Sequence, residues 1–341
     1  MDMDDLHKVA SDLVAPGKGI LAADESDKTI AKRFSAIGLE STEDARRIYR
    51  QLLFTTPGIE EFISGVILFD ETLRQSTDEA TPFAKYLASR GIIPGIKVDK
   101  GTIDLTNFPG EKITEGLDGL KQRLSEYKDL GAKFSKWRAV ITIGEAIPTD
   151  VCVNANSEVL ARYASISQEA GLVPIVEPEV LMDGTHAITT CEETTYKTLK
   201  SVFNKLSDYK VYLPGMLLKP NWIHPGKDSG QVAKDEDVAR STIRVLGESV
   251  PTEVPGVVFL SGGDSPVEST SHLNLLNITG GVPWQLSFSF GRALQETVLK
   301  TWQGKTENAE MAQKEFYKRA KLNSLARKGE YREEMEKEVQ V

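Results

Sequence analysis

Long apolar runs, cysteines and histidines are scarce in this sequence. Its 341 residues include only 2 cysteines, too few to stabilise a chain of this length by disulfides, so a reducing cytoplasm is the expected setting. No stretch approaches the roughly 18 consecutive apolar residues that a membrane-spanning helix needs. Residues 1–8 are acidic and lack the apolar segment of a secretion signal. We therefore expect a cytoplasmic protein without a membrane segment.

An excess of positive charge is also missing, because the formal net charge is −9. An acidic chain binds nucleic acid and anionic membranes poorly, so neither is an expected partner. A small anionic substrate remains compatible with this charge, since a local cluster of cations is enough to bind it.

The histidines do not have the spacing of a metal site. The 4 histidines are His7, His186, His224 and His272. The segment Asp183–His186 contains potential ligands, but its sequence is more typical of a surface turn. We expect neither a metal nor a cofactor.

Eight short apolar runs recur along the chain, separated by segments with helical periodicity. Several runs, such as Gly65–Phe69, are hydrophobic throughout, which is typical of parallel strands covered on both faces by helices. Between runs, apolar residues recur every three or four positions, as at Leu117, Leu120 and Leu124. The predicted strands are Gly19–Asp24, Gly65–Thr72, Ile92–Asp99, Ala132–Ile141, Leu172–Val180, Gly215–Trp222, Gly256–Ser261 and Trp284–Phe290.

This alternation predicts an α/β fold, a closed (β/α)8 barrel, with an open doubly wound sheet as the alternative. Composition does not change between the two halves, so a single domain is expected over residues 1–329, with an amino-terminal extension. Residues 330–341 are rich in Glu and Lys and are expected to form a charged, mobile tail. Thr190 and Glu193 have the spacing of a capping box, which predicts that a helix begins there.

Polar residues stand at the carboxyl end of almost every predicted strand. Three pairs have the i, i+2 spacing that points both side chains to one face of a strand. Strand-end charges that reach solvent, with salt bridges between them, would explain any one pair. Recurrence at the same end of the strands favours an active site instead. The residues are Asp24, Asp70, Glu71, Lys97, Asp99, Lys136, Arg138, Glu177, Glu179, Lys219, Ser261 and Ser289.

Lys219 lies in the apolar segment Leu217–Pro220 and has the chemistry of a carbonyl nucleophile. Burial and neighbouring cations favour the neutral amine, which can attack a ketone, and Lys136 and Arg138 are the predicted neighbours. Glu177 and Glu179 would supply acid–base groups for the loss of water. Taken alone, Lys219 would more simply be a structural lysine beside a proline.

Two segments predict binding sites for phosphate. The loop Ser261–Gly263 follows a strand and precedes a helix start near Pro266, and Gly291 with Arg292 follows the eighth strand. Loops in these positions commonly bind phosphate in barrels. A second group follows the first strand and comprises Ser26, Thr29, Lys32 and Arg33. Two separate anion sites would suit a substrate that is phosphorylated at both ends.

Seven motifs in order make the chain resemble the class I fructose-1,6-bisphosphate aldolases from Gly17 to about Gly329. They are Gly19–Ser26, Gly95–Gly101, Lys136–Arg138, Val176–Glu179, Leu217–Asn221, Leu260–Gly263 and Gly291–Leu294. The resemblance implies a metal-independent lyase of glycolysis and gluconeogenesis. It would cleave fructose 1,6-bisphosphate reversibly into dihydroxyacetone phosphate and glyceraldehyde 3-phosphate through a lysine Schiff base.

The resemblance also implies a role for each site residue. Lys219 would form the imine, Glu177 and Glu179 would serve acid–base chemistry, and Asp24 would take the C4 hydroxyl proton. Lys136 would stabilise developing charge, supported by Lys97 and Arg138. The ketose C1 phosphate would bind to Ser261, Gly262, Gly291 and Arg292. The other phosphate would bind to Ser26, Thr29, Lys32 and Arg33.

The chain departs from the family pattern at five positions. Animal members end in a tyrosine that helps protonate the enamine, whereas this chain ends in Val341, so Tyr331 or another group would replace it. Asp27–Lys28, Asp264 and Phe290 also differ from the usual residues and affect the expected substrate preference or rate.

The resemblance leaves the sugar and the assembly open. Sedoheptulose 1,7-bisphosphate and fructose 1-phosphate are alternative substrates of the same imine chemistry, and a noncatalytic scaffold is an alternative of another class. Phosphorylated sugars are the expected small-molecule partners. A homo-oligomer is expected because members are commonly homotetramers.

Overall fold

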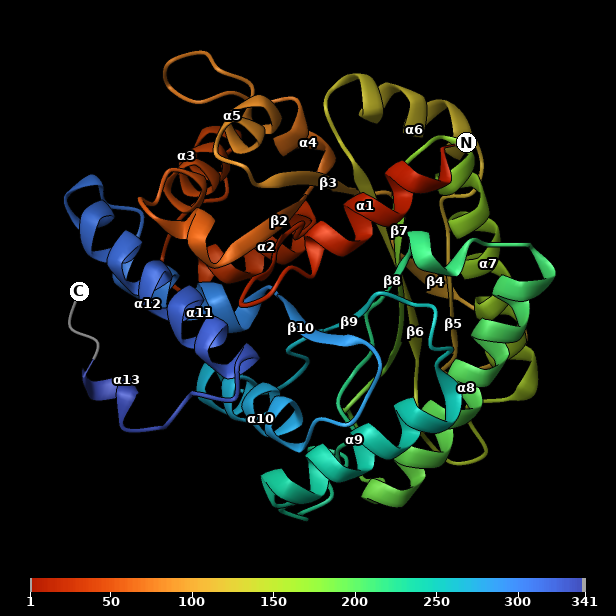
Figure 1. The fold of residues 1–341 in the computed structure, drawn as a ribbon. Helices are drawn as coiled ribbons and strands as arrows, with labels where there is room; N and C mark the ends of the chain where they lie inside the picture. Colours follow the sequence, from red (N-terminus) through yellow and green to blue (C-terminus); the bar gives the residue numbers. More distant parts are fainter. Residues whose placement is uncertain (1, 339–341) are drawn as a thin grey trace.

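The computed structural model describes residues 2–338, and eight of its strands close into one parallel barrel (Figure 1). The order around the barrel is β1-β10-β9-β8-β7-β6-β3-β2. These strands are β1 (Gly19–Ala23), β2 (Ile63–Leu68), β3 (Ile93–Lys97), β6 (Phe134–Ile141), β7 (Val173–Val180), β8 (Leu217–Leu218), β9 (Gly256–Phe259) and β10 (Gln285–Phe290). The predicted barrel is confirmed, and the open sheet is excluded.

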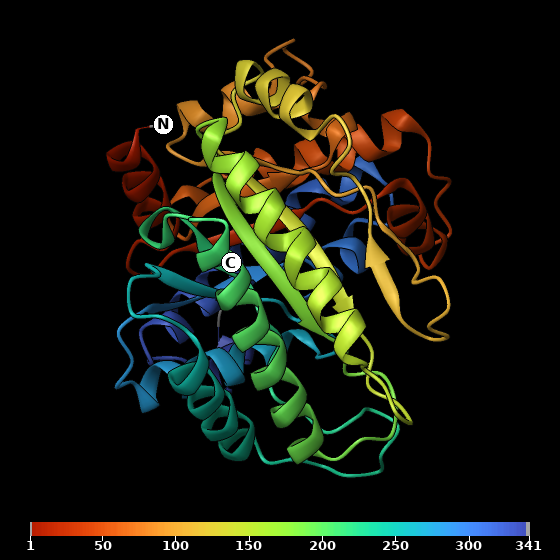
Figure 2. The ribbon, with the colours of Figure 1, turned by 90° about the vertical axis from the view of Figure 1, so that its right-hand side faces the viewer.

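Helices surround the barrel, as the sequence periodicity predicts. In Figure 2, α7 and α8 lie side by side on the outer face of β6 and β7. No helix in residues 2–338 is long and apolar enough to cross a bilayer. The longer helices are α1 (Met3–Leu13), α2 (Asp27–Ser35), α3 (Glu43–Phe54), α5 (Phe83–Ser89), α6 (Leu120–Asp129), α7 (Asp150–Glu169), α8 (Ile188–Asp208), α9 (Asp235–Ser249), α10 (Pro266–Thr279), α11 (Arg292–Trp302) and α12 (Ala309–Arg327).

Three local predictions differ from the structure. Strand β2 ends at Leu68, and the short helix α4 (Asp70–Leu73) begins where the strand was expected to continue. Helix α8 begins at Ile188 with Ala187 as its N-cap, so the predicted capping box of Thr190 and Glu193 is wrong. The antiparallel hairpin of β4 (Thr102–Asp104) and β5 (Lys112–Thr114) was not predicted, because each strand has only three residues.

The described part of the predicted tail packs against the barrel. Tyr331 is buried, and its backbone N–H donates to Asn274 Oδ1 at 3.0 Å. Glu336, on the short helix α13 (Met335–Glu338), accepts from the Tyr331 hydroxyl at 3.0 Å and forms a 2.5 Å ion pair with Arg319 of α12. Residues 339–341 lie outside the described residues, and the expected mobility of the tail stays a prediction.

The amino-terminal end of the barrel is closed by an apolar plug. Leu6, Ala10 and Leu13 of α1 pack in one buried cluster with inward-facing strand residues, including Phe134. Glycine makes room for this plug. A Cβ at Gly95 of β3 would lie 2.3 Å from the Phe134 ring, far inside van der Waals contact. The plug therefore fills the amino-terminal half of the interior, and polar side chains occupy the opposite end.

We predict that Gly95→Ala destabilises the protein by about 1–3 kcal/mol, because the new methyl group overpacks the barrel. The matched control is Gly247→Ala on the exposed face of α9, where a Cβ meets nothing within 4 Å. That change should stabilise by up to about 1 kcal/mol through helix propensity. Urea unfolding of both variants measures the two effects. Equal effects at the two positions would contradict the packing argument.

Candidate active site

A single open cavity of ≈ 670 Å³ lies at the carboxyl ends of the barrel strands. Every residue to which the family resemblance assigned a catalytic or phosphate-binding role, apart from Tyr331, lines it. Those residues are Asp24, Ser26, Thr29, Lys32, Arg33, Lys97, Lys136, Arg138, Glu177, Glu179, Lys219, Ser261, Gly262, Gly291 and Arg292. The carboxyl ends of all eight barrel strands lie on this side, so residues far apart in sequence face one another across the cavity.

Four buried charges form a continuous chain at the bottom of the cavity. Glu177 Oε1 lies 3.1 Å from Lys219 Nζ, and Glu177 Oε2 lies 3.1 Å from Lys136 Nζ. Lys136 Nζ also lies 2.7 Å from Asp24 Oδ2. The side chains of Lys136, Glu177 and Lys219 are no more than 5% exposed. Two carboxylates and two ammonium groups thus neutralise one another where water is largely excluded.

Strand geometry sets this order. Lys136 lies on β6, Glu177 on β7, and Lys219 directly follows β8, so three adjacent strands each supply one group. Residues i and i+2 of a strand point to the same face, which brings Glu179 and Arg138 to the cavity as well. The side chain of Arg138 forms an ion pair with Glu179, and its backbone N–H donates to Asp99 Oδ2 at 3.2 Å.

Mutual attraction keeps the central groups charged. Burial alone would raise the pKa of the Asp24 and Glu177 carboxyls, but the charges of Lys136 and Lys219 outweigh burial and hold both pKa values below their ordinary range. Burial would lower the pKa of Lys136, and the charges of Asp24 and Glu177 raise it instead. All three groups are therefore ionised at neutral pH.

One phosphate-site candidate lies between two strand ends. Ser261 and Gly262 follow β9, and Gly262 has φ +52°, in the left-handed region that glycine adopts without strain. Arg292 opens α11 and donates to the Gly262 carbonyl, which ties the two loops together. The amino terminus of α11 presents backbone N–H groups and the positive end of the helix dipole.

The other candidate lies on α2. Ser26 is its N-cap residue, and its hydroxyl lies 3.2 Å from that of Thr29. Arg33 forms an ion pair with buried Glu25, whereas no ion pair is found for Lys32 within residues 2–338. Lys32 is thus the cation of this group that is most available to an anionic ligand.

Glu25 and Ser289 are among the cavity-lining residues that were given no individual role from the sequence. Glu25 binds Arg33 and Arg50, and Gln295 joins it at 2.9 Å, so this network orients Arg33. Ser289, at the end of β10, is buried, and its hydroxyl has no hydrogen-bond partner within the described residues. The strand-end position of Ser289 was the only sequence signal, and Glu25 had none beyond its place beside Asp24.

Other strand-end residues lie elsewhere. Asp70 and Glu71 were predicted to end a strand beside the site, but they form ion pairs with Arg74 and Arg46 on the outside and do not line the cavity. The helix that starts at Asp70 turns both side chains away. Tyr331 is likewise absent from the cavity lining.

Comparisons with known proteins agree with this site. Residues 5–341 match the model of the glycolytic family "Fructose-bisphosphate aldolase class-I". The chain belongs to the class I fructose-bisphosphate aldolases. It is therefore a carbon–carbon lyase, and the predictions of the family and of the barrel are confirmed.

Relatives from a bacterium, a plant and a parasite are similar over most of their length. The "Probable fructose-bisphosphate aldolase class 1" of Xanthomonas campestris is 54% identical over 97% of this chain and 100% of its own. "Fructose-bisphosphate aldolase 4, cytosolic" of Arabidopsis thaliana is 53% identical over 93% of this chain and 81% of its own. A solved aldolase of Plasmodium falciparum, in complex with TRAP and a small-molecule inhibitor, superposes with a TM-score of 0.95. It is 49% identical, and the match covers 97% of this chain and 96% of that one.

We predict that Lys136→Met costs about 3–5 kcal/mol of stability at neutral pH, because it leaves two buried carboxylates without their shared cation. In the wild type, the lowered pKa values of Asp24 and Glu177 keep both groups ionised from pH 7 down to about pH 5. In the variant, burial raises both pKa values, and protonation relieves the penalty. The stability difference between the two proteins should therefore shrink as the pH falls from about 7 to 5.

Urea unfolding at several pH values measures this difference. The control is Lys121→Met, which breaks an exposed ion pair with Glu169 whose side chains are 67% and 58% exposed. Its cost should stay below about 1 kcal/mol. A loss in Lys136→Met that does not change with pH would show that lost packing, and not buried charge, is responsible.

Proposed function

We propose that this aldolase cleaves fructose 1,6-bisphosphate through an imine between Lys219 and the substrate ketone. The observation that carries this proposal is the 3.1 Å contact between the buried Lys219 ammonium and the Glu177 carboxylate. Transfer of one proton across that contact converts the ion pair into an amine and a carboxylic acid. The amine is then a nucleophile at the floor of a cavity that is lined for anion binding.

In imine formation, the proton that Glu177 takes from Lys219 is later given to the departing hydroxyl group. The Lys219 amine attacks the ketone carbon, and the nitrogen passes a proton to the carbonyl oxygen to give a neutral carbinolamine. Glu177 then donates its proton to the departing hydroxyl, which leaves as water, and the nitrogen becomes a protonated imine. Glu177 is a carboxylate again after this step, so the positively charged imine nitrogen regains its carboxylate partner.

Cleavage of the C3–C4 bond needs a base and an electron acceptor. The Asp24 carboxylate takes the C4 hydroxyl proton, the bond breaks to release the aldehyde, and its electron pair forms an enamine with the imine nitrogen. Lys136, 2.7 Å from Asp24, offsets the charge that shifts during proton transfer. Arg138, Lys97 and Glu179 line the same cavity and support the charges of Asp24, Lys136, Glu177 and Lys219. Protonation at C3 and hydrolysis then release dihydroxyacetone phosphate.

Two anion sites at the ends of the cavity suit a bisphosphate. We propose that Ser261, Gly262, Gly291 and Arg292 bind the C1 phosphate, which is the phosphate that stays with the imine. Ser26, Thr29, Lys32 and Arg33 would bind the phosphate that leaves with glyceraldehyde 3-phosphate. Sedoheptulose 1,7-bisphosphate satisfies the same two sites, whereas fructose 1-phosphate uses only the first.

We also propose a cytoplasmic location and a homo-oligomer, commonly a tetramer in this family. The location is supported by the names of three Arabidopsis relatives, each termed cytosolic. A noncatalytic scaffold is disfavoured because all four buried charges of the reaction centre are present.

Borohydride reduction in the presence of dihydroxyacetone phosphate should inactivate the protein by a covalent adduct on Lys219. Peptide mass mapping locates the adduct, and Lys219→Met should neither trap substrate nor turn over. Glu177→Gln should still bind substrate but form the adduct about 10²–10⁴-fold more slowly, because it lacks the acid–base group. An adduct on another lysine, or turnover by Lys219→Met, would overturn the imine assignment.

Lys32→Met should lower kcat/KM for fructose 1,6-bisphosphate by about 10- to 100-fold, the effect of losing a charge-assisted hydrogen bond. It should leave kcat/KM for fructose 1-phosphate nearly unchanged, because that sugar lacks the second phosphate. Lys28→Met on the same helix is the matched control, since Lys28 does not line the cavity. Equal losses for the two sugars would place Lys32 outside the second phosphate site.

A further inference from the structure

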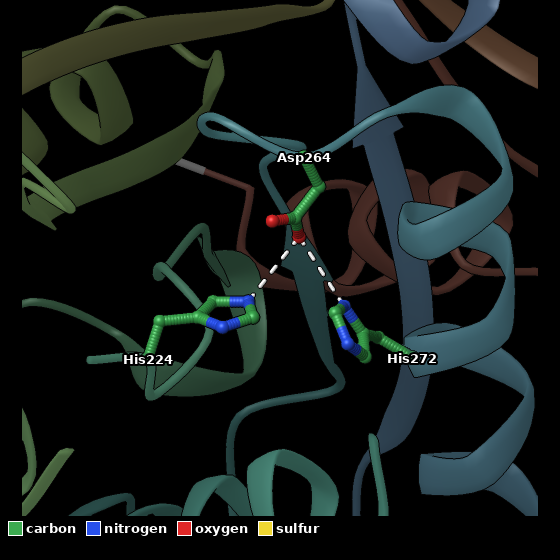
Figure 3. A group of neighbouring side chains, drawn as sticks. All are labelled: His224, Asp264 and His272. Carbon is green, nitrogen blue, oxygen red and sulfur yellow. Dashed lines mark hydrogen bonds and ion pairs between the residues drawn. The ribbon is translucent and has the colours of Figure 1, made fainter. Parts of the chain in front are cut away.

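Two histidines and a carboxylate converge beside the phosphate loop, outside the cavity described above. His224 lies in the segment after β8, Asp264 follows Gly262 and Gly263, and His272 lies on α10. Figure 3 shows both rings directed at the Asp264 carboxylate. His224 Nε2 lies 3.3 Å and His272 Nδ1 lies 3.2 Å from the same atom, Asp264 Oδ2.

The separations fit the coordination shell of a small metal ion. Nitrogen and oxygen ligands bind zinc at about 2.0–2.2 Å, so neighbouring corners of the tetrahedron lie about 3.3–3.6 Å apart, close to the contacts of 3.3 and 3.2 Å with Asp264. An N–H···O hydrogen bond is most often about 2.9–3.0 Å long, shorter than either contact here. One nitrogen or oxygen atom from each of the three residues lies within 4.8 Å of the others.

A second carboxylate orients His272 as metal-binding histidines are usually oriented. His272 Nε2 lies 3.3 Å from Asp235 Oδ1, so its other nitrogen, Nδ1, faces Asp264. The Ser271 hydroxyl donates to Asp235 Oδ2 at 2.7 Å and fixes that carboxylate. A carboxylate behind the ring is the common outer partner of a metal-binding histidine, because it sets the tautomer and raises basicity.

Burial and charge favour a cation at this position. The side chains of Asp264 and His272 are 6% and 3% exposed, so the carboxylate is largely removed from water. Asp264 and Asp235 bring two carboxylates to the two imidazole rings. A divalent ion bound here would be attracted by both carboxylates and would take the place of a proton on the rings. A cavity of ≈ 280 Å³ that has room for water is lined by His224 and Gly263, although not by Asp264 or His272.

We propose that His224, Asp264 and His272 bind one divalent ion of the zinc type, with water in the fourth position. Imidazole and carboxylate ligands together suit Zn²⁺, Co²⁺ and Ni²⁺ better than Mg²⁺ or Ca²⁺. The ion would join the segment after β8, the loop that follows β9 and helix α10. It takes no part in the imine chemistry, and the proposal does not depend on the roles assigned above.

A proton is the competing occupant of the same group. Burial would lower the pKa of His272, but hydrogen bonds to Asp235 and Asp264 outweigh burial and raise it to about 9. The metal-free protein then holds the three side chains together as an ion-paired network. Zinc binding and this network are distinguished by titration with the metal.

Titration of the metal-free protein with Zn²⁺, in competition with a chromophoric chelator, should show one saturable site per chain. Co²⁺ at the same site should give the intense visible absorption of tetrahedral coordination. Asp235→Asn should weaken Zn²⁺ binding by about 10- to 100-fold, the usual effect of losing an outer partner. His224→Gln and Asp264→Asn should weaken it further, because each removes a ligand.

His186→Asn is the control, since His186 lies near the same loops but outside the group. It should bind Zn²⁺ as the wild type does. Circular dichroism and melting temperature of each metal-free variant show whether it is folded. Zn²⁺ should raise the melting temperature of the wild type and of His186→Asn by similar amounts, and that of Asp235→Asn by less. The proposal is wrong if the wild type shows no saturable site. It is also wrong if folded His224→Gln binds Zn²⁺ as tightly as the wild type.

Discussion

The burial of Glu177 between two ammonium groups is the interaction on which the rest of the site depends. Moving a carboxylate out of water costs several kcal/mol even after the protein relaxes, and an unpaired lysine costs as much. Contacts of 3.1 Å on both carboxylate oxygens, and the further contact of Lys136 with Asp24, offset that cost. Under the proposed mechanism, the arrangement also places the Lys219 ammonium beside the carboxylate that accepts its proton. A structure that only needed stability would fill this position with apolar side chains.

The barrel makes the arrangement possible because apolar packing and polar groups occupy opposite halves of its interior. The amino-terminal half of the interior is filled by the plug around Phe134 and α1, which holds the strands in register. The carboxyl-terminal half is left to polar groups from neighbouring strands, with β6 and β7 paired over eight residues. Lys219 follows β8, a strand of only two residues, so its side chain reaches inward where the sheet stops. Packing of the apolar plug in the amino-terminal half therefore fixes the distances between the charged groups in the carboxyl-terminal half.

The sequence predicted what depends on local periodicity and missed what depends on distant contacts. The i, i+2 spacing placed Lys136 with Arg138 and Glu177 with Glu179 on the cavity face, because strand alternation is a local rule. Asp70 and Glu71 were misplaced because β2 ends at Leu68 and a helix begins at Asp70, where the two carboxylates form ion pairs with Arg74 and Arg46. The group of His224, Asp264 and His272 gave no signal, since three separate elements bring it together. Tyr331, the candidate replacement for the family's terminal tyrosine, lies outside the cavity lining with its hydroxyl bonded to Glu336, and its role stays a prediction.

The central claim is that Glu177 is held ionised by Lys136 and Lys219 in the resting enzyme. Carbon-13 NMR of protein labelled at the glutamate carboxyls reports the ionisation state of each carboxyl. The variant Glu177→Gln assigns the resonance of Glu177. The resonance of Glu177 should remain that of a carboxylate until the pH is below about 4.3, the ordinary value for glutamate. A Glu177 carboxyl that titrates near neutral pH would contradict the account, because the two lysines would then not determine its charge.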